Sequence, residues 1–510
     1  MAVVPTPVLL RDLVASVEGA RLVRGGPATP IGGITQDSRA VAPGDLFVAI
    51  PGFERDGLDF APEALSRGAK AILVEGPSQV EFFRLLASRF SGHEPIVVVP
   101  HARTALADVS AALYGHPSKT MPVVGITGTD GKTSTTHLLS AILEAHGLRI
   151  GWLTTVNTRI GDQVRPNAAD HTTPEAPIVQ RTLAEMRAAH VDVAILETSS
   201  HALSLERVRG VHYQVGVFTN LSPEHLNFHG SFDAYRAAKR LLFERLQVDG
   251  LAVLNADDPS SAVMRSATRA RTVTYALDTP ADISAHDLQL TPRGTTFVVE
   301  PGGVMVRTTL IGKFNVSNWL AAYAAARHFG ATLDDMRRAA LVQLPVPGRM
   351  NLVERGQPFA VIVDFAHTPQ ALEKALDTVR SLVGGRVLLA FGLAGGRDAA
   401  NRPVMGELAS RKADFFAITM DDPGYEEPAA IAEEIAAGAR AAGGRFTVEL
   451  DRRAAIRLLF ERAQPGDAVL LAGKGHEQRM VVGSQKLPWN DARVAAEVLA
   501  EMGQPMHAVP

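Results

Sequence analysis

Short apolar runs alternate with stretches of helical periodicity along the middle of the chain. Between residues 121 and 254 the runs occupy positions 121–127, 191–196, 215–218 and 251–254, and helical segments lie between most of them. Strands that are apolar on both faces are typical of a parallel sheet covered by helices on both sides. The pattern therefore predicts a central α/β domain built on a parallel sheet.

The same alternation precedes and follows this region. Further apolar runs lie at 45–49, 71–74 and 96–99, with a helical stretch at 61–68, and then at 360–365, 387–391, 415–419, 446–450 and 468–471. Residues 280–310 alternate apolar and polar side chains around turn residues, which predicts a short antiparallel section. The stretch LPVPG at 344–348 is a predicted linker, because two prolines and a glycine interrupt any regular element.

We predict three α/β domains from this organisation. A small α/β domain spans 1–102, a central parallel-sheet domain spans 103–345, and a Rossmann-like domain spans 346–510. The length of 510 residues agrees with this division, since one domain holds roughly 150 residues.

Composition and charge narrow the possible functions. Hydrophobic residues make up 46% of the chain and charged residues 21%, which is typical of a folded globular protein. The formal net charge is -3, and without a basic excess we expect neither nucleic acid nor an anionic membrane as a partner. The absence of cysteine excludes disulfides, thiolate nucleophiles and cysteine-bound metals. Any metal must bind to oxygen or imidazole ligands.

The chain carries no pattern of a membrane protein. No apolar run approaches the roughly 20 residues of a membrane helix, and the start MAVVPTPVLLRDLVAS lacks the basic segment of a signal peptide. We expect a cytoplasmic enzyme, monomeric, that acts on small molecules.

The stretch VVGITGTDGKT, residues 123–133, predicts a phosphate-binding loop. A buried strand leads into a glycine-rich turn that opens directly into an amphipathic helix. Gly128 and Gly131 let backbone N–H groups close around an anion, and the helix N-terminus adds its partial positive charge. Lys132 can reach the β- and γ-phosphates, and the Thr133 hydroxyl can bind Mg²⁺. The match to GxxxxGK[ST] is imperfect because Ile126 stands at the first glycine position.

The segment TGTDGKT at 127–133 resembles the TGTNGKT loop of the Mur ligase family, with Asp130 where the family usually has asparagine. Members of this family are ATP-dependent amide ligases that act through an acyl phosphate. The resemblance implies that ATP is a co-substrate and that the central domain has the P-loop ATPase type of sheet. The residues that it places against ATP in this loop are Gly128, Thr129, Asp130, Gly131, Lys132, Thr133 and Ser134.

Two strand ends in the central domain carry candidate ligands for Mg²⁺. Glu197 follows the apolar run 191–196, and His225 lies in the segment after the run 215–218. Open parallel sheets bind ligands at the carboxyl edge, and Mg²⁺ prefers oxygen ligands that include phosphates. Thr133 and Glu197 could supply one such site. A histidine in a loop is also common as a structural hydrogen-bonding group, so His225 alone leaves its role open.

Lys239 lies in a predicted helix at 233–246 among apolar neighbours. It could be a solvated lysine, or a partly buried one that loses its proton more easily. The stretch AAKRLLF at 237–243 resembles the Mur ligase segment whose lysine is carbamylated by CO₂. The resemblance implies that the carbamate of Lys239, with Glu197 and His225, holds a second Mg²⁺.

The resemblance extends over nearly the whole chain and is strongest to the MurE-type branch, which adds the third residue to UDP-N-acetylmuramoyl-L-alanyl-D-glutamate. The segment DSRAVAPGDLFVA at 37–49 is similar to the uridine-binding stretch of that branch, and HTTP at 171–174 to its muramoyl-peptide segment. The residues implied for this substrate are Ser38, Thr172, Thr173, Ser199 and Arg207. Without the resemblance, the hydroxyl residues read as turn residues and Arg207 as a surface charge. Leu205 stands at a neighbouring substrate-contact position where the family commonly has glutamine.

Further motifs imply a nucleotide contact from the second half of the chain. GKFNVSN at 312–318 and PGRM at 347–350 resemble the adenine-side and linker motifs, with Asn318 and Arg349 touching ATP. DFAHTP at 364–369 resembles the segment that supplies a ribose-binding acid, Asp364, and a phosphate-side histidine, His367. Asp364 taken alone could equally be a helix cap.

The incoming amino acid is implied to bind in the C-terminal domain. Arg402 matches an arginine that pairs with its α-carboxylate, and Gly473 and Glu477 in GKGHE match residues that hold it. Gly396 stands at a position where the family normally has an acidic residue. Members that select meso-diaminopimelate carry DNPR, whereas this chain reads Asp421, Asp422, Pro423, Gly424.

This departure predicts a basic acceptor without a distal carboxylate, L-lysine or L-ornithine. Gly424 offers no cation for a buried carboxylate, and Asp422 adds a negative charge that suits an ammonium group. Meso-diaminopimelate remains the alternative, if an arginine elsewhere in the C-terminal domain meets its carboxylate.

Two other functions stay open on the sequence. One is a different amide ligase of the same family, such as folylpolyglutamate synthase or the ligase part of cyanophycin synthetase. The other is a nucleotide-binding switch that hydrolyses ATP slowly. The first domain and the GKGHE stretch argue against the first, and convergence of Glu197, His225 and Lys239 would argue against the second.

Overall fold

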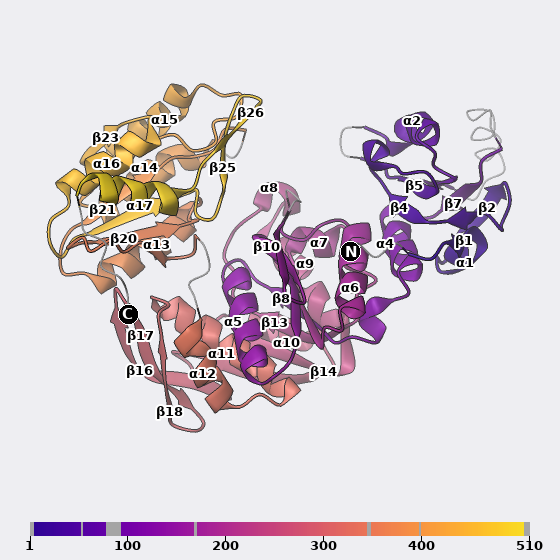
Figure 1. Cartoon of the computed structure of the whole chain (residues 1–510), viewed down its shortest axis with the longest axis horizontal. Coiled ribbons are helices and arrows are strands. Elements are labelled where there is room, and N and C mark those ends of the chain that lie inside the picture. Colours follow the sequence, from indigo (N-terminus) through magenta and orange to yellow (C-terminus); the bar gives the residue numbers. More distant parts are fainter. Residues whose placement is uncertain are drawn as a thin grey trace. The chain divides into compact units, whose positions relative to one another are not determined.

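The computed structural model describes residues 5–52, 55–77, 93–167, 171–343, 348–396 and 399–503. The chain divides into two compact units. The first unit holds Met1–Asp282 and Ala321–Thr332, and the second holds Ile283–Leu320 and Leu333–Pro510. Each unit is built on α/β layers (Figure 1).

The first unit begins with a five-stranded sheet in the order β2-β7-β6-β5-β4. Neighbouring strands are parallel except at the β2–β7 edge. Alternate side chains of β5 and β6 face opposite sides: Leu46 and Leu73 pack with helices α1 and α4, and Phe47 and Ile72 pack with helix α2. The elements are β2 (Arg21–Arg24), β4 (Gly33–Thr35), β5 (Asp45–Ala49), β6 (Ala71–Glu75), β7 (Ile96–Val99), α1 (Leu10–Ala15), α2 (Ala61–Ser66) and α4 (Ala102–Leu113), with a small pair β1 (Val8–Leu9) and β3 (Pro30–Ile31).

The central sheet of the first unit has the order β11-β10-β9-β12-β8-β13-β14-β15. Strands β9, β12, β8, β13, β14 and β15 are parallel to their neighbours in this order. The hairpin β10–β11 pairs with β9 in antiparallel orientation and extends the sheet. The strands are β8 (Val123–Thr127), β9 (Ile150–Leu153), β10 (Asn157–Ile160), β11 (Gln163–Pro166), β12 (Val193–Glu197), β13 (Tyr213–Phe218), β14 (Leu246–Asn255) and β15 (Arg271–Ala276). The helices are α5 (Lys132–Ala145), α6 (Ala176–Ala188), α7 (Ser200–Ser204), α8 (Leu226–His229), α9 (Phe232–Glu244) and α10 (Ser261–Ser266).

Strand β8 lies between β12 and β13, and both neighbours run parallel to it. Their registers align Glu197 with Ile126, and Phe218 with Thr127. The segments that follow these three strands therefore leave the sheet at the same edge. The strand order reverses around β8, and ligands of open α/β sheets bind at such a switch point.

The second unit begins with an antiparallel meander of β16 (Ile283–Thr291), β17 (Gly294–Glu300) and β18 (Val304–Thr308). This confirms the predicted antiparallel section at 280–310. Helix α11 (Lys313–Ala326) and helix α12 (Leu333–Val342) follow it.

The C-terminal sheet of the second unit has the order β19-β20-β24-β21-β22-β23 and is parallel except for β19. Apolar side chains of α13, α14 and α15 cover one face, and those of α16 and α17 cover the other, as expected for a Rossmann-like domain. The strands are β19 (Asn351–Leu352), β20 (Ala360–Asp364), β21 (Val387–Phe391), β22 (Phe415–Ile418), β23 (Phe446–Val448) and β24 (Ala468–Ala472), and a separate hairpin joins β25 (Arg479–Val482) to β26 (Gln485–Pro488). The helices are α13 (Pro369–Leu382), α14 (Asn401–Lys412), α15 (Pro428–Ala441), α16 (Arg452–Arg462) and α17 (Asp491–Glu501).

The α/β class and the three-domain architecture predicted from the sequence are confirmed. The domain boundaries at 102 and 345 stay predictions, and the linker at 344–348 lies outside the described residues except for Gly348. The hairpins β10–β11 and β25–β26 were not predicted, because β11 and β26 are exposed along their whole length and each hairpin lies outside the longer apolar runs. In the described part of the chain, none of the helices is both long and apolar enough to cross a membrane.

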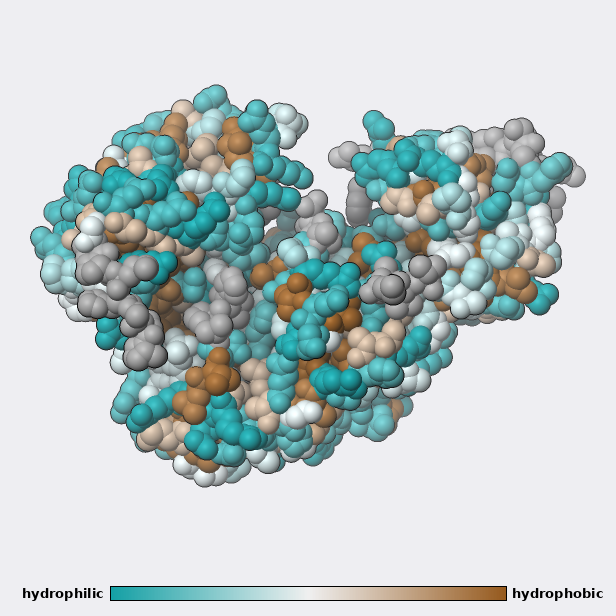
Figure 2. All heavy atoms as spheres, viewed as in Figure 1, coloured by the Kyte–Doolittle hydropathy of each residue, from teal (hydrophilic) through white to brown (hydrophobic). Residues whose placement is uncertain are grey.

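The apolar runs are buried in the sheets, and the visible surface is mostly hydrophilic with hydrophobic residues interspersed (Figure 2). Helices α14 and α15 approach each other closely through two glycines. A Cβ atom added at Gly406 would lie 2.0 Å from the Ile435 carbonyl oxygen, and one added at Gly438 would lie 2.0 Å from the Pro403 carbonyl oxygen. Both obstacles are backbone atoms, which cannot rotate away.

We predict that Gly406→Ala destabilises the second unit. The added methyl group must push the two helices apart, which costs roughly 1–3 kcal/mol in a well-packed core. Gly384→Ala is the control, because a Cβ atom at Gly384 meets nothing within 4 Å. Calorimetry should show a lower Tm for Gly406→Ala alone; equal melting of the two variants would contradict the close helix contact.

Candidate active site

The predicted phosphate loop joins β8 to α5. Gly131 stands at the N-cap of α5 with φ +84°, a left-handed conformation that favours glycine. Helix α5 begins at Lys132, and the side chains of Thr133 and Ser134 are buried beneath the loop. The N–H groups of the first helical turn are thus available at the carboxyl end of the sheet, where an anion binds most favourably.

The segment after β13 supports this loop. The Thr129 N–H donates to the Asn220 carbonyl oxygen at 2.9 Å, and the Asp130 N–H donates to the Asn220 side-chain oxygen at 3.0 Å. The Thr219 hydroxyl donates to the Asp130 carbonyl oxygen at 2.6 Å. These three hydrogen bonds fix the shape of the loop. Thr219 and Asn220 were not identified from the sequence. Both directly follow the apolar run 215–218, in the same segment that contains His225.

Two lysines converge on one carbonyl oxygen of the loop. Lys132 Nζ and Lys239 Nζ donate to the Gly128 carbonyl oxygen at 3.0 and 2.7 Å. Lys239 on α9 is only 2% exposed, and its Nζ lies 4.5 Å from the centre of the Tyr235 ring. Burial, and then the neighbouring Lys132 charge, lower the pKa of Lys239 well below its usual value.

Within the described ranges, neither lysine has a carboxylate oxygen at ion-pair distance. A buried ammonium without an anionic partner is strongly unfavourable. Burial therefore favours the neutral amine of Lys239, which is a nucleophile, more than it would be favoured in an exposed lysine, while the charges of Glu224 and Asp130 act in the opposite direction.

Glu197 is the last residue of β12 and is fully buried. Its Oε1 accepts the Thr155 N–H at 3.1 Å and its Oε2 accepts the Thr155 hydroxyl at 3.0 Å. The carboxylate is thus held by neutral donors, with further lone pairs on its oxygens. Thr155 was not identified from the sequence, because it belongs to the turn before β10 and no motif contains it.

His225 precedes α8 in a left-handed conformation, φ +56°, and its side chain is 46% exposed. Its ring lies edge-on to His201, with 4.7 Å between ring centres, and His201 also contacts Phe228 and His229. Burial, followed by the neighbouring histidines, lowers the pKa of His201 to about 4. His225 and His229 also contact Tyr235 of helix α9, the helix that carries Lys239. With its lowered pKa, His201 is neutral at physiological pH.

Three of the residues implied for the UDP substrate form one hydrogen-bonded group. The Thr173 hydroxyl contacts the Ser199 hydroxyl at 3.1 Å and donates to the Glu197 carbonyl oxygen at 2.7 Å. Arg207 donates to the Thr173 carbonyl oxygen at 3.1 Å and pairs with Glu175 at 2.8 Å. Thr172 adjoins this group and is half-buried. The group thus lies directly beside the end of β12.

Ser38, the remaining residue implied for the UDP substrate, lies between strands β4 and β5 of the five-stranded sheet. It begins a short 3₁₀ turn, is buried, and its hydroxyl donates to Glu63 at 2.7 Å.

In the second unit, Arg349 and His367 gather around Phe365. The Arg349 guanidinium lies 4.9 Å from the centre of the Phe365 ring, and the rings of His367 and His476 lie 4.6 and 5.0 Å from it. Asp364 ends β20, where its carboxylate accepts the N–H groups of Met350 and Ala366 at 2.8 and 2.9 Å. Phe365 and His476 were missed as members of this group, although both stand inside quoted motifs. Asn318 lies on α11, where its amide donates to Asn315 at 3.2 Å.

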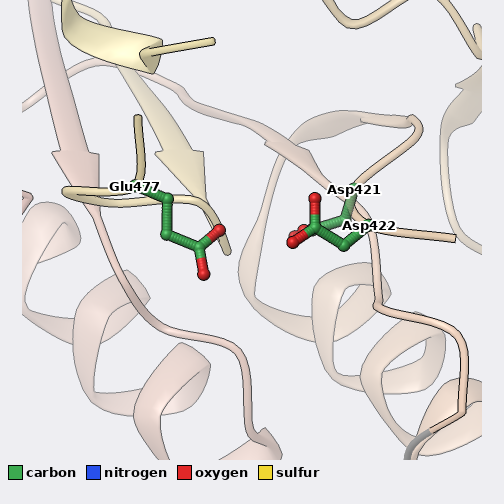
Figure 3. Close-up of side chains that lie close together, drawn as sticks. All are labelled: Asp421, Asp422 and Glu477. Carbon is green, nitrogen blue, oxygen red and sulfur yellow. The ribbon is translucent and has the colours of Figure 1, made fainter. Parts of the chain in front are cut away.

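The segments after β22 and β24 form a charged cluster in which Asp421 and Lys474 are buried and Asp422 and Glu477 are partly exposed. The carboxylates of Asp421, Asp422 and Glu477 lie within 4.8 Å of one another, and Figure 3 shows Glu477 turned toward the other two. Lys474 Nζ lies among them, at 2.7 Å from Asp422, 2.5 Å from Glu477 and 3.6 Å from Asp421. We call these four residues the acidic cluster. Its ammonium occupies the position that a metal ion would otherwise need.

The ionisation of the acidic cluster follows from its burial. Burial raises the pKa of Asp421 and that of Glu477. Burial alone would lower the pKa of Lys474, but Asp421, Glu477 and Asp422 together raise it. Gly473, φ +103°, fits here because a Cβ atom would lie 2.5 Å from Asp421 Oδ2. Lys474 was not identified from the sequence, although it lies within the GKGHE stretch.

Arg402 is buried at the start of α14 and already has two anionic partners. It pairs with Glu426 at 2.8 Å and with Glu434 at 3.2 Å. Glu426 also accepts the Gly396 N–H at 2.5 Å, so the chain's own carboxylate occupies a site made of a guanidinium and a backbone N–H. Gly424 lies nearby in a left-handed turn, φ +58°, where a Cβ atom would meet nothing within 4 Å.

Three family models match successive parts of the chain. Residues 30–114 match the Mur ligase family catalytic domain, residues 126–326 match the Mur ligase middle domain, and residues 348–475 match the Mur ligase glutamate ligase domain. A protein of Roseiflexus sp. (strain RS-1) named UDP-N-acetylmuramyl-tripeptide synthetase is 44% identical over 501 residues, 94% of this chain and 96% of that protein.

This chain belongs to the Mur ligase family. It is therefore an ATP-dependent amide ligase, and the resemblance identified from the sequence is confirmed.

Other relatives carry two different names. A protein of Deinococcus radiodurans named UDP-N-acetylmuramyl-tripeptide synthetase is 46% identical over 479 residues, 93% of this Mur ligase and 95% of that protein. A protein of Geobacillus thermodenitrificans named UDP-N-acetylmuramoyl-L-alanyl-D-glutamate--2,6-diaminopimelate ligase is 41% identical over 500 residues, 96% and 99% of the two chains. A solved structure with the latter name is 28% identical, with a TM-score of 0.67 over 98% of this chain and 99% of that one.

We predict that Lys132→Ala abolishes acyl-phosphate formation in this Mur ligase but leaves binding of the UDP-linked substrate within about twofold. Lys132 belongs to the phosphate loop, whereas the group around Thr173 and Arg207 does not depend on its side chain. Phosphate release and calorimetric binding measure the two effects separately. Near-normal turnover in the variant would contradict the assignment of the loop.

Proposed function

We propose that this Mur ligase adds the third residue to UDP-N-acetylmuramoyl-L-alanyl-D-glutamate in peptidoglycan precursor synthesis. Full-length relatives named for this reaction support the proposal, as do the three-domain match and the clustering of Thr173, Ser199 and Arg207. The acidic cluster is the observation that carries it, because a partly buried anionic site suits an amino-acid acceptor with a cationic group.

The reaction has two steps. The D-glutamyl carboxylate attacks the γ-phosphorus of ATP, ADP leaves, and an acyl phosphate forms. The neutral amine of the amino acid then attacks the acyl carbon, phosphate leaves with the bond electrons, and the nitrogen loses one proton to the departing phosphate or to solvent. Lys132 and the N–H groups of α5 stabilise the negative charge on the phosphates, which is the main electrostatic demand of the first step. The Asn318, Arg349, Asp364 and His367 side chains complete the ATP site in this proposal.

The residues of the first unit suit Mg²⁺, because they supply a hydroxyl, a carboxylate and an imidazole at one sheet edge. Thr133 and Glu197 would hold one ion, and Glu197, His225 and a carbamylated Lys239 would hold a second. Bound Mg²⁺ would neutralise the phosphates and the carboxylate that must meet. Carbamylation of Lys239 is supported by its burial and lowered pKa, since CO₂ reacts with the neutral amine.

We predict that Lys239 carries a carbamate. The wild-type protein incubated with ¹³C-labelled bicarbonate should show a carbamate resonance in its NMR spectrum, and Lys239→Ala should lack it. Lys132→Ala serves as the matched control, since it removes the other amine at the same carbonyl oxygen and should retain the resonance. This readout does not depend on turnover.

Lys239→Ala should also lose activity by about a hundredfold or more, and short carboxylates in the medium should restore part of it by supplying an anion. A spectrum in which the wild type and Lys239→Ala are indistinguishable would refute carbamylation.

The acceptor is proposed to be L-lysine or L-ornithine. Three carboxylates and one ammonium leave the acidic cluster with two excess negative charges when all four groups are ionised. Desolvation raises the pKa of Asp421 and that of Glu477, so further negative charge at this position is disfavoured. A bound ammonium group relieves the excess, whereas a distal carboxylate adds to it.

The buried cations of this region do not offer an easy partner for a distal carboxylate. Among the described residues, Lys474 is engaged with the acidic cluster, and Arg402 with Glu426 and Glu434. Meso-diaminopimelate is the second candidate, favoured by the names of the Geobacillus relative and of the 28% identical structure.

We predict that kcat/KM with L-lysine or L-ornithine exceeds that with meso-diaminopimelate by about tenfold or more. The double variant Asp422→Asn, Gly424→Arg should shift the ratio toward meso-diaminopimelate, because it removes one negative charge and adds a cation. Position 424 has room for a side chain, although its left-handed conformation costs an arginine roughly 1–2 kcal/mol. A wild-type preference for meso-diaminopimelate would overturn the acceptor assignment but not the ligase activity.

A further inference from the structure

Behind the acidic cluster lies an ion pair that the reaction scheme does not use. Arg452 and Asp491 have fully buried side chains, and they form two hydrogen bonds, Nε to Oδ1 at 2.8 Å and Nη2 to Oδ2 at 2.7 Å. Arg452 is the first residue of α16 and Asp491 the first of α17. The pair therefore joins the N-termini of two helices on one face of the C-terminal sheet.

The remaining donors of Arg452 reach the ends of two strands. Its Nη2 donates to the Ala472 carbonyl oxygen at 2.8 Å, and its Nη1 donates to the Met420 carbonyl oxygen at 3.3 Å. Met420 immediately precedes Asp421 and Asp422, and Ala472 immediately precedes Gly473 and Lys474. One guanidinium thus holds the backbone directly before both halves of the acidic cluster.

Asp491 extends this support to Glu477. Its Oδ1 also accepts the Trp489 indole N–H at 2.8 Å, and the Trp489 backbone N–H donates to the Gln478 carbonyl oxygen at 3.0 Å. Asn490 donates to the Glu477 carbonyl oxygen at 3.4 Å. All three carboxylates of the cluster are therefore attached, through short backbone links, to the same ion pair.

Stability alone gives a poor account of this arrangement. A cation in the first turn of a helix opposes the helix dipole, and a fully buried ion pair often stabilises a protein no more than apolar residues of the same size. The guanidinium supplies fixed hydrogen-bond donors that point at two strand ends, and an apolar side chain has no such donors.

We propose that Arg452 and Asp491 are positioning residues for the amino-acid acceptor: the pair fixes the separation between Asp421–Asp422 and Lys474–Glu477 that the acceptor must fit. The inference rests on the proposed function, because it takes the acidic cluster as the acceptor site. It adds a determinant of acceptor recognition that touches neither ATP nor the UDP-linked substrate.

The test is a comparison of KM values in the full-length enzyme. Arg452→Lys keeps the charge but cannot reach Asp491 and both carbonyl oxygens together. Its KM for the acceptor should rise about tenfold or more, since displacements of about 1 Å at a reacting site have effects of this size. The KM values for ATP and the UDP-linked dipeptide should stay within about twofold of wild type.

Arg453→Lys is the matched control. Arg453 is the next residue of the same helix, and its partners Glu497 and Glu501 lie on the surface. Trp489→Phe is the milder second variant, because it removes only one hydrogen bond to Asp491, and it should raise the acceptor KM in the same direction by a smaller factor.

The outcomes separate the inference from the function on which it rests. Equal changes in all three KM values, or a lowered Tm with unchanged acceptor KM in both Arg452→Lys and Trp489→Phe, would overturn the positioning role. Should Arg452→Lys fail to fold, an unchanged acceptor KM in Trp489→Phe would overturn it too. Failure of the wild type to use any amino acid with the UDP-linked dipeptide would instead refute the proposed function.

Discussion

Parallel strands covered by helices on both faces leave polar side chains one favourable place to gather, the edge where the strands end. Both large sheets of this Mur ligase obey that constraint. In the central sheet the ends of β12, β8 and β13 bring Glu197, the phosphate loop and the segment of Asn220 together. In the C-terminal sheet the ends of β20, β22 and β24 bear Asp364, Asp421 and Gly473. Every candidate catalytic contact depends on these edges being rigid.

Charge at the two edges is balanced in opposite ways. At the central edge two lysines meet at one carbonyl oxygen, where the charge of Lys132 suits phosphates and adds to the effect of burial in lowering the pKa of Lys239. The C-terminal edge holds more carboxylates than cations, which suits an ammonium ligand. Such unbalanced buried charge lowers the stability of the free enzyme, and ligand binding relieves it.

Sequence motifs identified the groups that carry charge but seldom the groups that hold them. Lys132 lies in a glycine-rich motif and Glu197 directly after an apolar run, whereas Asp421 and Glu477 were found through segments that resemble those of the family. Thr155, Thr219 and Lys474 act through hydrogen bonds or ion pairs to those residues. Such contacts join segments distant in the chain, and a threonine or lysine is too common for its identity alone to reveal one.

The sequence by itself determined the α/β class and the three-domain architecture, because hydrophobic periodicity is a local property. Its motifs resembled those of the Mur ligase family, and the glycine spacing predicted the phosphate loop. Tertiary structure alone decided that Lys239 is buried with no carboxylate at ion-pair distance among the described residues, that Arg402 already pairs with Glu426 and Glu434, and that Arg452 lies behind the acidic cluster. These facts depend on which strand ends become neighbours when the strand order reverses. That arrangement in space decides which charged groups are buried and which are paired. It cannot be read directly from the spacing of residues along the chain.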